Sequence, residues 1–221
     1  MKFSRTFSPL GTVVAAVVVL SACSGSGEGA SKDRNDAPIG WSTCNALFGA
    51  DRIDVLQDEM GEGTLETLNS SRPVDELMSE RASVAKSWKP GSERHYSNSA
   101  HPCDVGVEGT SARFNSYVRW SVDTPKGIKD GVASVPGWKA AGGDVYVVHE
   151  DSGLHLTALF PCKIKGSHPD QEAELPLEVE TEVNNLPDFD TKLLSEMTAQ
   201  LARNLAKKLP CTNNPEIPSA L

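Results

Sequence analysis

Four cysteines, spread over most of the chain, constrain most strongly what this sequence can fold into. Cys44, Cys103, Cys162 and Cys211 follow one another at intervals of about 50 to 60 residues. If they are oxidised, two disulfides close long loops, and each would contribute about 4 kcal/mol in the chain-entropy model. A zinc site is the alternative, but the spacings are wide and the sequence has no C-x-x-C pair. The choice depends on the compartment in which the protein folds.

The start of the chain indicates that compartment. A short basic segment with Lys2 and Arg5 precedes an apolar run over residues 10–20. This is the organisation of a secretory signal, and the run is too short to span a bilayer comfortably. No positively charged stop-transfer segment follows it, which disfavours an uncleaved membrane anchor. The sequence therefore predicts export to a compartment in which disulfides form.

The end of the apolar run, Leu20-Ser21-Ala22-Cys23, resembles the lipobox of bacterial lipoproteins. The resemblance implies that residues 1–22 are a signal peptide and that Cys23 carries a diacylglycerol. The protein would then be lipid-anchored at the extracytoplasmic face of the cell membrane, because two or more acyl chains hold firmly. The alternative is an ordinary secretory signal followed by a chance cysteine. With Cys23 lipidated, the four other cysteines form an even set, which predicts two disulfides with three possible pairings.

Length and charge narrow the organisation further. The 221 residues suit one domain with tails, and the net charge of −9 argues against a nucleic acid partner. Residues 23–40 have almost no apolar side chains, so we expect a disordered tether. Residues 212–221 are expected to be a flexible tail. A single folded domain is predicted over residues 41–211.

Apolar residues recur at helical spacing before and after the middle of the chain. Residues 51–60 and 74–88 each present one apolar face, and a helical turn is expected around Cys44. The last helix has the broadest apolar stripe, from Leu193 to Leu209. A helix of this length would be about 30 Å long, enough to cross a whole sheet.

Alternation with a period of two indicates strands in the region between these helices. The glutamates from Glu174 to Glu182 alternate with apolar residues, and we interpret them as the solvated face of an edge strand that begins near Pro176. Residues 124–143 are rich in glycine and proline and predict a long loop. Five strands are expected, over residues 103–107, 113–122, 144–149, 154–162 and 175–183.

Helices, then a run of strands with short connections, then a helix predict an α+β fold. We expect a two-layer sandwich in which an antiparallel sheet of about five strands carries helices on one face. The pairing Cys44–Cys103 and Cys162–Cys211 is favoured, because each bond would join the helix layer to the sheet layer.

The whole arrangement resembles the small cysteine-containing lipoproteins of unknown function that are widespread in actinobacteria. The shared features are the lipobox, the polar tether, the helix start Cys44-x-x-Leu47, cysteine-bearing central strands and a terminal helix that ends at Cys211. The resemblance implies no known activity.

Two histidines are candidate metal ligands. His149 and His155 flank the turn of the predicted hairpin, and a three-residue loop would place them face to face across the two strands. With Glu150 or Asp151 nearby, the pair would bind zinc or nickel weakly. The alternative is that both histidines face solvent at the hairpin tip.

Trp138 in the glycine-rich segment is a candidate ligand contact, and the alternative is that it folds back into the core. No catalytic residue or cofactor is predicted, because the sequence has no G-x-S-x-G, no H-E-x-x-H and no S-x-x-K accompanied by its partner motifs. The sequence thus favours a non-enzymatic binding or envelope-accessory lipoprotein, with an envelope protein or a small ligand as partner. The alternatives are a cell-envelope hydrolase and a weak metal-binding module through His149 and His155.

Overall fold

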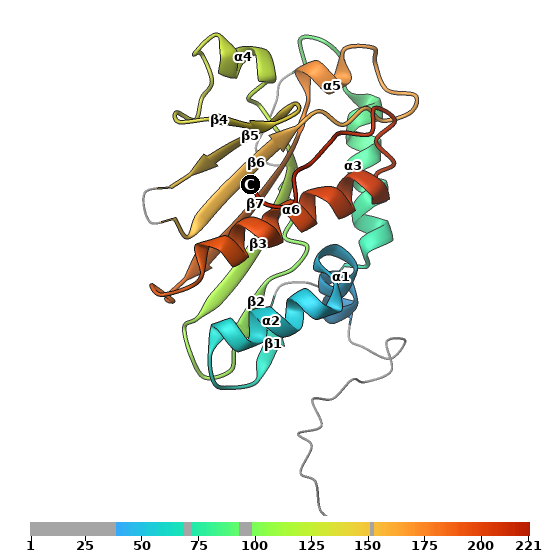
Figure 1. Cartoon of the computed structure of the whole chain (residues 1–221). Helices are drawn as coiled ribbons and strands as arrows, with labels where there is room; N and C mark the ends of the chain where they lie inside the picture. The colour runs from blue at the N-terminus through green and yellow to red at the C-terminus, as the bar shows by residue number, and fades with distance from the viewer. Residues whose placement is uncertain (1–38, 69–71, 93–98, 151–152) are drawn as a thin grey trace, which may run out of the picture. The chain divides into compact units, whose positions relative to one another are not determined.

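Seven strands form one antiparallel sheet, and helices pack against it (Figure 1). The computed structural model describes residues 39–68, 72–92, 99–150 and 153–221, which belong to one compact unit. The predicted signal peptide, Cys23 and the predicted tether up to residue 38 lie outside the described residues. Within the described ranges, no helix combines the length and the apolar character needed to cross a bilayer. The elements are α1 (Ile39–Phe48), α2 (Ala50–Met60), β1 (Leu65–Thr67), α3 (Val74–Ser87), β2 (Val105–Val107), β3 (Arg113–Trp120), α4 (Pro125–Lys129), β4 (Lys139–Gly142), β5 (Val145–His149), β6 (His155–Phe160), α5 (Gln171–Glu174), β7 (Leu177–Asn184) and α6 (Thr191–Lys208).

The strand order is β1-β2-β3-β7-β6-β5-β4, with every neighbouring pair antiparallel. The α+β class and the antiparallel sheet are confirmed, but the expected strand number of about five is wrong, because the sheet has seven. The additional strands are β1 and β4 at the two edges. Both are short, and the Lys-Ala-Ala-Gly sequence of β4 has neither alternation nor β-branched residues, so no local pattern announces it.

The prediction that residues 175–183 form an edge strand is also wrong. β7 lies in the centre of the sheet, with β3 on one side and β6 on the other. Pro176 is tolerated because it precedes the first residue of the strand, where no ladder hydrogen bond is required from it. The glutamates of β7 are therefore flanked by two other strands, and Glu178 and Glu180 are buried.

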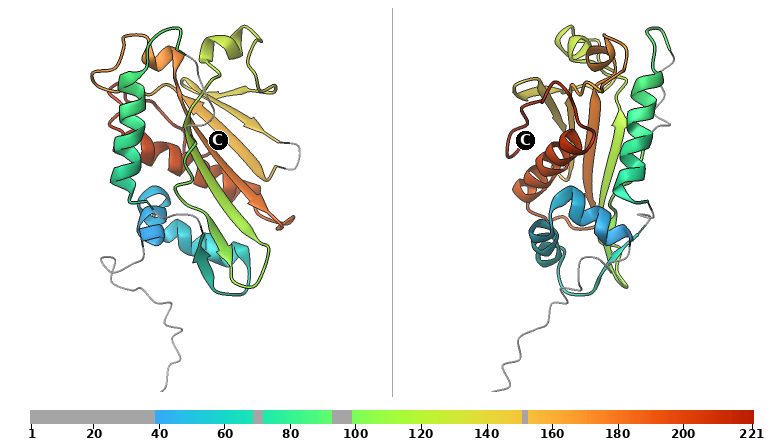
Figure 2. Two further views of the ribbon diagram at one scale, coloured as in Figure 1. Left: turned by 180° about the vertical axis from the view of Figure 1, so that it is seen from behind. Right: turned by 90° about the vertical axis from the view of Figure 1, so that its right-hand side faces the viewer.

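Helix α6 covers one face of β6 and β7, as both views in Figure 2 show. The side chain of Asp190 caps its N-terminus by accepting a hydrogen bond from the Lys192 amide at 2.8 Å. The hydroxyls of Thr181 on β7 and Thr198 on α6 are hydrogen-bonded in the middle of this contact. Apolar side chains on this side of the sheet and on α6 form the core, among them Phe114, Val118, Leu156, Leu177, Val179, Met197 and Leu201.

The N-terminal helices pack around α6 and β3. Gly49 and Gly61 delimit α2 with φ values of 89° and 91°, a backbone conformation that favours glycine. Helix α1 contacts α6, and α3 contacts both α6 and β3. The Trp120 indole N–H donates to the Arg81 carbonyl oxygen at 2.9 Å, which joins β3 to α3 in the buried interior.

The four cysteines form the two pairs favoured from the sequence. Cys44 on α1 is bonded to Cys103, just before β2, with the two Cα atoms 5.0 Å apart. Cys162, just after β6, is bonded to Cys211, which follows α6, with a Cα–Cα distance of 4.9 Å. Each bond therefore links a helix to the sheet.

The segment after α6, which we expected to be a flexible tail, is packed against the domain. Asn213 donates to the Pro161 carbonyl oxygen at 3.1 Å, and the Ser195 hydroxyl exchanges hydrogen bonds with the backbone of Leu221. Ile217 and Leu221 are partly buried against the core. Pro215 and Pro218 suggest a loose segment, whereas hydrogen bonds from Thr212 to Lys163 and between Leu221 and Ser195 hold its backbone at both ends.

Candidate functional site

A cluster of charged side chains lies on the face of the sheet opposite α6. Because successive residues of a strand point to opposite faces, the apolar residues of β7 face α6 and the glutamates of β7 face away from it. Neighbouring strands add polar side chains at matching register positions on this second face. We refer to eight of these residues together as the polar cluster: Asn115, Tyr117, Arg119, Glu150, His155, Glu178, Glu180 and Glu182.

Arg119 holds two of the carboxylates in the polar cluster. Its Nη2 forms an ion pair with Glu178 and lies 2.9 Å from Oε2 of Glu180. Burial raises the pKa of Glu178 above its usual value, although Arg119 and the Ser121 hydroxyl act in the opposite direction. Burial would also raise the pKa of Glu180, but the bond to His155 and the charge of Arg119 outweigh it, so that pKa is lowered.

His155 lies between two carboxylates. Its Nδ1 is 2.7 Å from Oε1 of Glu150, and its Nε2 is 3.0 Å from Oε1 of Glu180. The bond with Glu180 raises the pKa of the imidazole above its usual value, and Glu150 adds to this, whereas burial opposes it. The ring orientation is thus determined from both sides by charged partners.

Glu182 is oriented by neutral donors. Its Oε1 accepts hydrogen bonds from the Tyr117 hydroxyl at 3.0 Å and from Nδ2 of Asn115 at 2.7 Å. Burial and the bond to Glu182 raise the pKa of Tyr117, so the phenol stays a donor.

One ligand atom each from His155, Glu180 and Glu182 lies within 4.8 Å of the others. Among the described residues, this is the group of histidine, cysteine, aspartate and glutamate side chains whose ligand atoms are close enough to hold a metal ion.

The structure does not bring His149 and His155 face to face. His149 pairs with Leu156, and the Glu150 amide closes the hairpin on the His155 carbonyl oxygen. Adjacent register positions point to opposite faces, so His155 joins the polar cluster and His149 faces the α6 side of the sheet. For His149 and His155 to be register partners, the loop between the two strands would have to be one residue shorter than it is. His149 has a lowered pKa because of burial and the nearby charge of Lys139.

Trp138 is neither freely exposed nor part of the core. Its indole N–H donates to Oδ2 of Asp123 at 3.1 Å, and the side chain is partly buried. Asp123 also accepts from the Ser134 amide at 2.6 Å, the Ser134 hydroxyl at 2.7 Å and the Val135 amide at 3.2 Å. The prediction of a long loop over residues 124–143 is wrong, because this segment contains α4 and β4. The carboxylate of Asp123 links three of its residues, Ser134, Val135 and Trp138.

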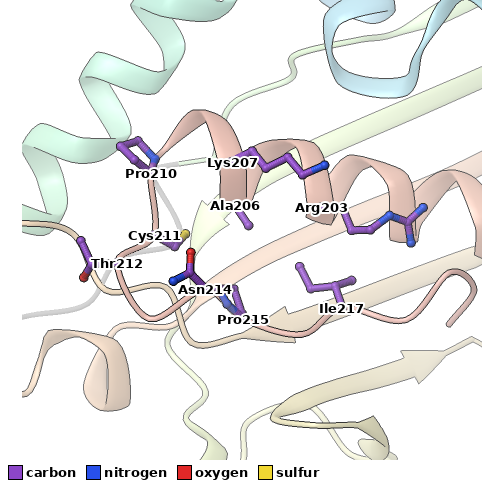
Figure 3. A pocket seen from close by; sticks show the side chains of 9 residues that line it. All are labelled: Arg203, Ala206, Lys207, Pro210, Cys211, Thr212, Asn214, Pro215 and Ile217. Atoms are coloured by element: carbon purple, nitrogen blue, oxygen red, sulfur yellow. The ribbon is translucent and has the colours of Figure 1, made fainter.

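Two grooves border the segment after α6. One, of about 620 Å³, has Arg203 and Lys207 of α6 on one wall and Pro215 and Ile217 on the other (Figure 3). Arg203 already donates to the Pro218 carbonyl oxygen and to Gln200. The second groove, of about 820 Å³, lies between this segment, α4 and α5, and Lys126, Lys129, Glu172 and Glu174 are among its lining residues.

Most of the polar cluster is not predictable from the sequence. The prediction that the glutamates form a solvated face is wrong for Glu178 and Glu180, which are 3% and 9% exposed. Their partners Tyr117, Arg119 and His155 come from strands distant in the sequence. The one local signal was the alternation of glutamate on a strand, which does not reveal what lies beside it.

The pKa of His155 predicts how stability depends on pH. A raised pKa in the folded state means that the contribution to stability is complete below the unfolded value of about 6.5 and is lost as pH rises through the folded value. We therefore expect the difference in unfolding free energy between wild type and His155→Gln to shrink as pH rises above about 6.5. Urea unfolding at a series of pH values measures it.

His149→Gln is the matched control for this prediction. Because the pKa of His149 is lowered, its contribution should change with pH in the opposite direction. Equal pH profiles for wild type and His155→Gln would show that the ion pairs of His155 do not form.

No protein-family model, curated protein or solved structure matches this chain.

Proposed function

We propose that this protein is a lipid-anchored, extracytoplasmic binding module of the bacterial envelope and not an enzyme. The observation that carries the proposal is the use of the cysteines. Five are present, and the two disulfides use Cys44, Cys103, Cys162 and Cys211. Cys23 is left, at the position where the lipobox pattern calls for a lipid-bearing thiol.

The disulfides support export, because such bonds persist in oxidising compartments. Both link a helix to the sheet, so a compartment that oxidises these cysteines stabilises the native fold. A lipid on Cys23 and the polar segment before Ile39 would then hold this domain at the outer face of the membrane.

A binding role agrees better with the grooves than hydrolysis does. Residues of the glycine-rich segment line the groove beside α4, together with acidic residues such as Glu172 and Glu174, and the lining includes no histidine. His155 lies elsewhere, on β6, with its ring nitrogens facing Glu150 and Glu180. A small charged ligand or a protein segment fits the observed lining.

Replacement of Cys23 tests the proposed anchor. In a bacterial host that expresses the full chain, we expect labelled palmitate to be incorporated into wild type and into Ser24→Ala, and incorporation to be abolished in Cys23→Ser. Intact mass of the purified protein should show a diacylated or triacylated chain that begins at Cys23. An unlabelled wild-type chain, or label that persists in Cys23→Ser, would contradict the proposal.

A further inference from the structure

Three potential metal ligands converge on the polar face of the sheet. His155 on β6 and Glu182 on β7 are direct register partners, and Glu180 is the next residue of β7 on the same face. Their ligand atoms lie within 4.8 Å of one another. A zinc ion holds its nitrogen and oxygen ligands at about 2.0–2.2 Å in a tetrahedral arrangement, so its ligand atoms are about 3.3–3.6 Å apart. Rotations of the two carboxylate side chains would close the remaining difference.

Each of the three side chains is oriented by a second residue. Glu150 accepts from Nδ1 of His155 at 2.7 Å, which leaves Nε2 facing Glu180, 3.0 Å from its Oε1. A carboxylate on the other ring nitrogen is the usual support of a metal-binding histidine, because it determines the tautomer and raises the basicity of the ligand atom. Tyr117 orients Glu182, and Arg119 orients Glu180.

The ligand nitrogen of His155 faces carboxylate oxygens in a buried position. Nε2 is shielded from solvent and lies 3.0 Å from Oε1 of Glu180. Imidazole nitrogen and carboxylate oxygen are both ligands of first-row transition metals. A divalent cation placed between His155 and the two carboxylates would bind all three side chains.

The charges of the cluster favour a cation. In the described ranges, four carboxylates, those of Glu150, Glu178, Glu180 and Glu182, surround one guanidinium and one imidazole. A divalent ion would offset the surplus of negative charge. Magnesium and calcium take oxygen ligands alone, whereas an imidazole nitrogen with carboxylates suits zinc and its neighbours in the first transition series.

We propose that His155, Glu180 and Glu182 form a binding site for one divalent transition metal ion, with Zn²⁺ as the preferred probe and Glu150 as the supporting residue. This set replaces the pair His149 and His155 expected from the sequence. The proposal does not depend on the lipid anchor.

Calorimetric titration of the full, oxidised chain in detergent with ZnCl₂ tests this site. Wild type should bind one ion per chain, and MgCl₂ should give no comparable heat. His155→Gln should weaken Zn²⁺ binding by more than tenfold. Glu150→Gln should weaken it by about 10- to 100-fold, the usual effect of losing a supporting carboxylate.

His149→Gln is the matched control, because it changes a histidine of the same hairpin on the opposite face of the sheet. It should bind Zn²⁺ as wild type does. Circular dichroism in the near ultraviolet verifies that each variant is folded, and Glu182→Gln takes the place of His155→Gln if the latter is not. Absence of Zn²⁺ binding to wild type, or equal affinity in wild type and the ligand variants, would overturn the proposal.

Discussion

Removal of the Cys162–Cys211 disulfide in a Cys162→Ala/Cys211→Ala variant is expected to lower the free energy of unfolding by about 4 kcal/mol. The bond closes a loop with a sequence separation of 49 residues. Its loss therefore raises the conformational entropy of the unfolded chain over the residues that form β7 and α6 in the native state. Both cysteines are buried, and their replacement also removes packing between the end of β6 and the segment after α6. Equilibrium urea unfolding, followed by circular dichroism, measures the change.

The second disulfide supplies a comparison for this result. Cys44→Ala/Cys103→Ala opens a loop with a sequence separation of 59 residues, and a loss of similar size, about 4 kcal/mol, is expected. Cys23→Ala should leave the unfolding free energy unchanged, because Cys23 takes no part in either bond. A loss below about 1 kcal/mol in both double variants would mean that the disulfides do not constrain the unfolded chain as the entropy model requires.

Asp123→Ala is expected to lower the free energy of unfolding by about 3 kcal/mol. The carboxylate is 5% exposed and accepts four hydrogen bonds, from Ser134, Val135 and Trp138. Its removal breaks all four hydrogen bonds and releases the segment that contains α4 and β4. Urea unfolding measures the loss, and faster amide hydrogen exchange over residues 134–138 should accompany it.

The effect of Asp123 should disappear in acid. Burial alone would raise the pKa of this carboxyl, but the hydrogen bonds outweigh it and the pKa is lowered. The contribution to stability is therefore complete above the unfolded value of about 3.9 and is lost as pH falls through the folded value. Ser134→Ala, which removes one of the four bonds, should cost about 1 kcal/mol. A loss in Asp123→Ala no larger than in Ser134→Ala would contradict the assigned role.

The polar cluster shows why the candidate site was only partly predictable. The sequence singled out His155, because it lies beside a turn with strong hairpin signals. It did not single out Glu180 or Glu182, whose pattern is equally typical of a solvated strand. Their partners on β3 are more than 60 residues away in the chain, and a local pattern contains no information on which strands become neighbours.

The sequence by itself determined the α+β class, the strands β2, β3, β5, β6 and β7 and the last helix, because alternation and helical spacing are local patterns that each of these segments displays. It also indicated the cysteine pairs, since each links a helical to a sheet segment. Only the tertiary structure decided that β7 lies in the centre of the sheet, that β1 and β4 form the edges, and that His149 and His155 face opposite ways. The reason is physical, because strand order and hairpin register are set by contacts between distant segments, and a shift of one residue exchanges the two faces of a strand.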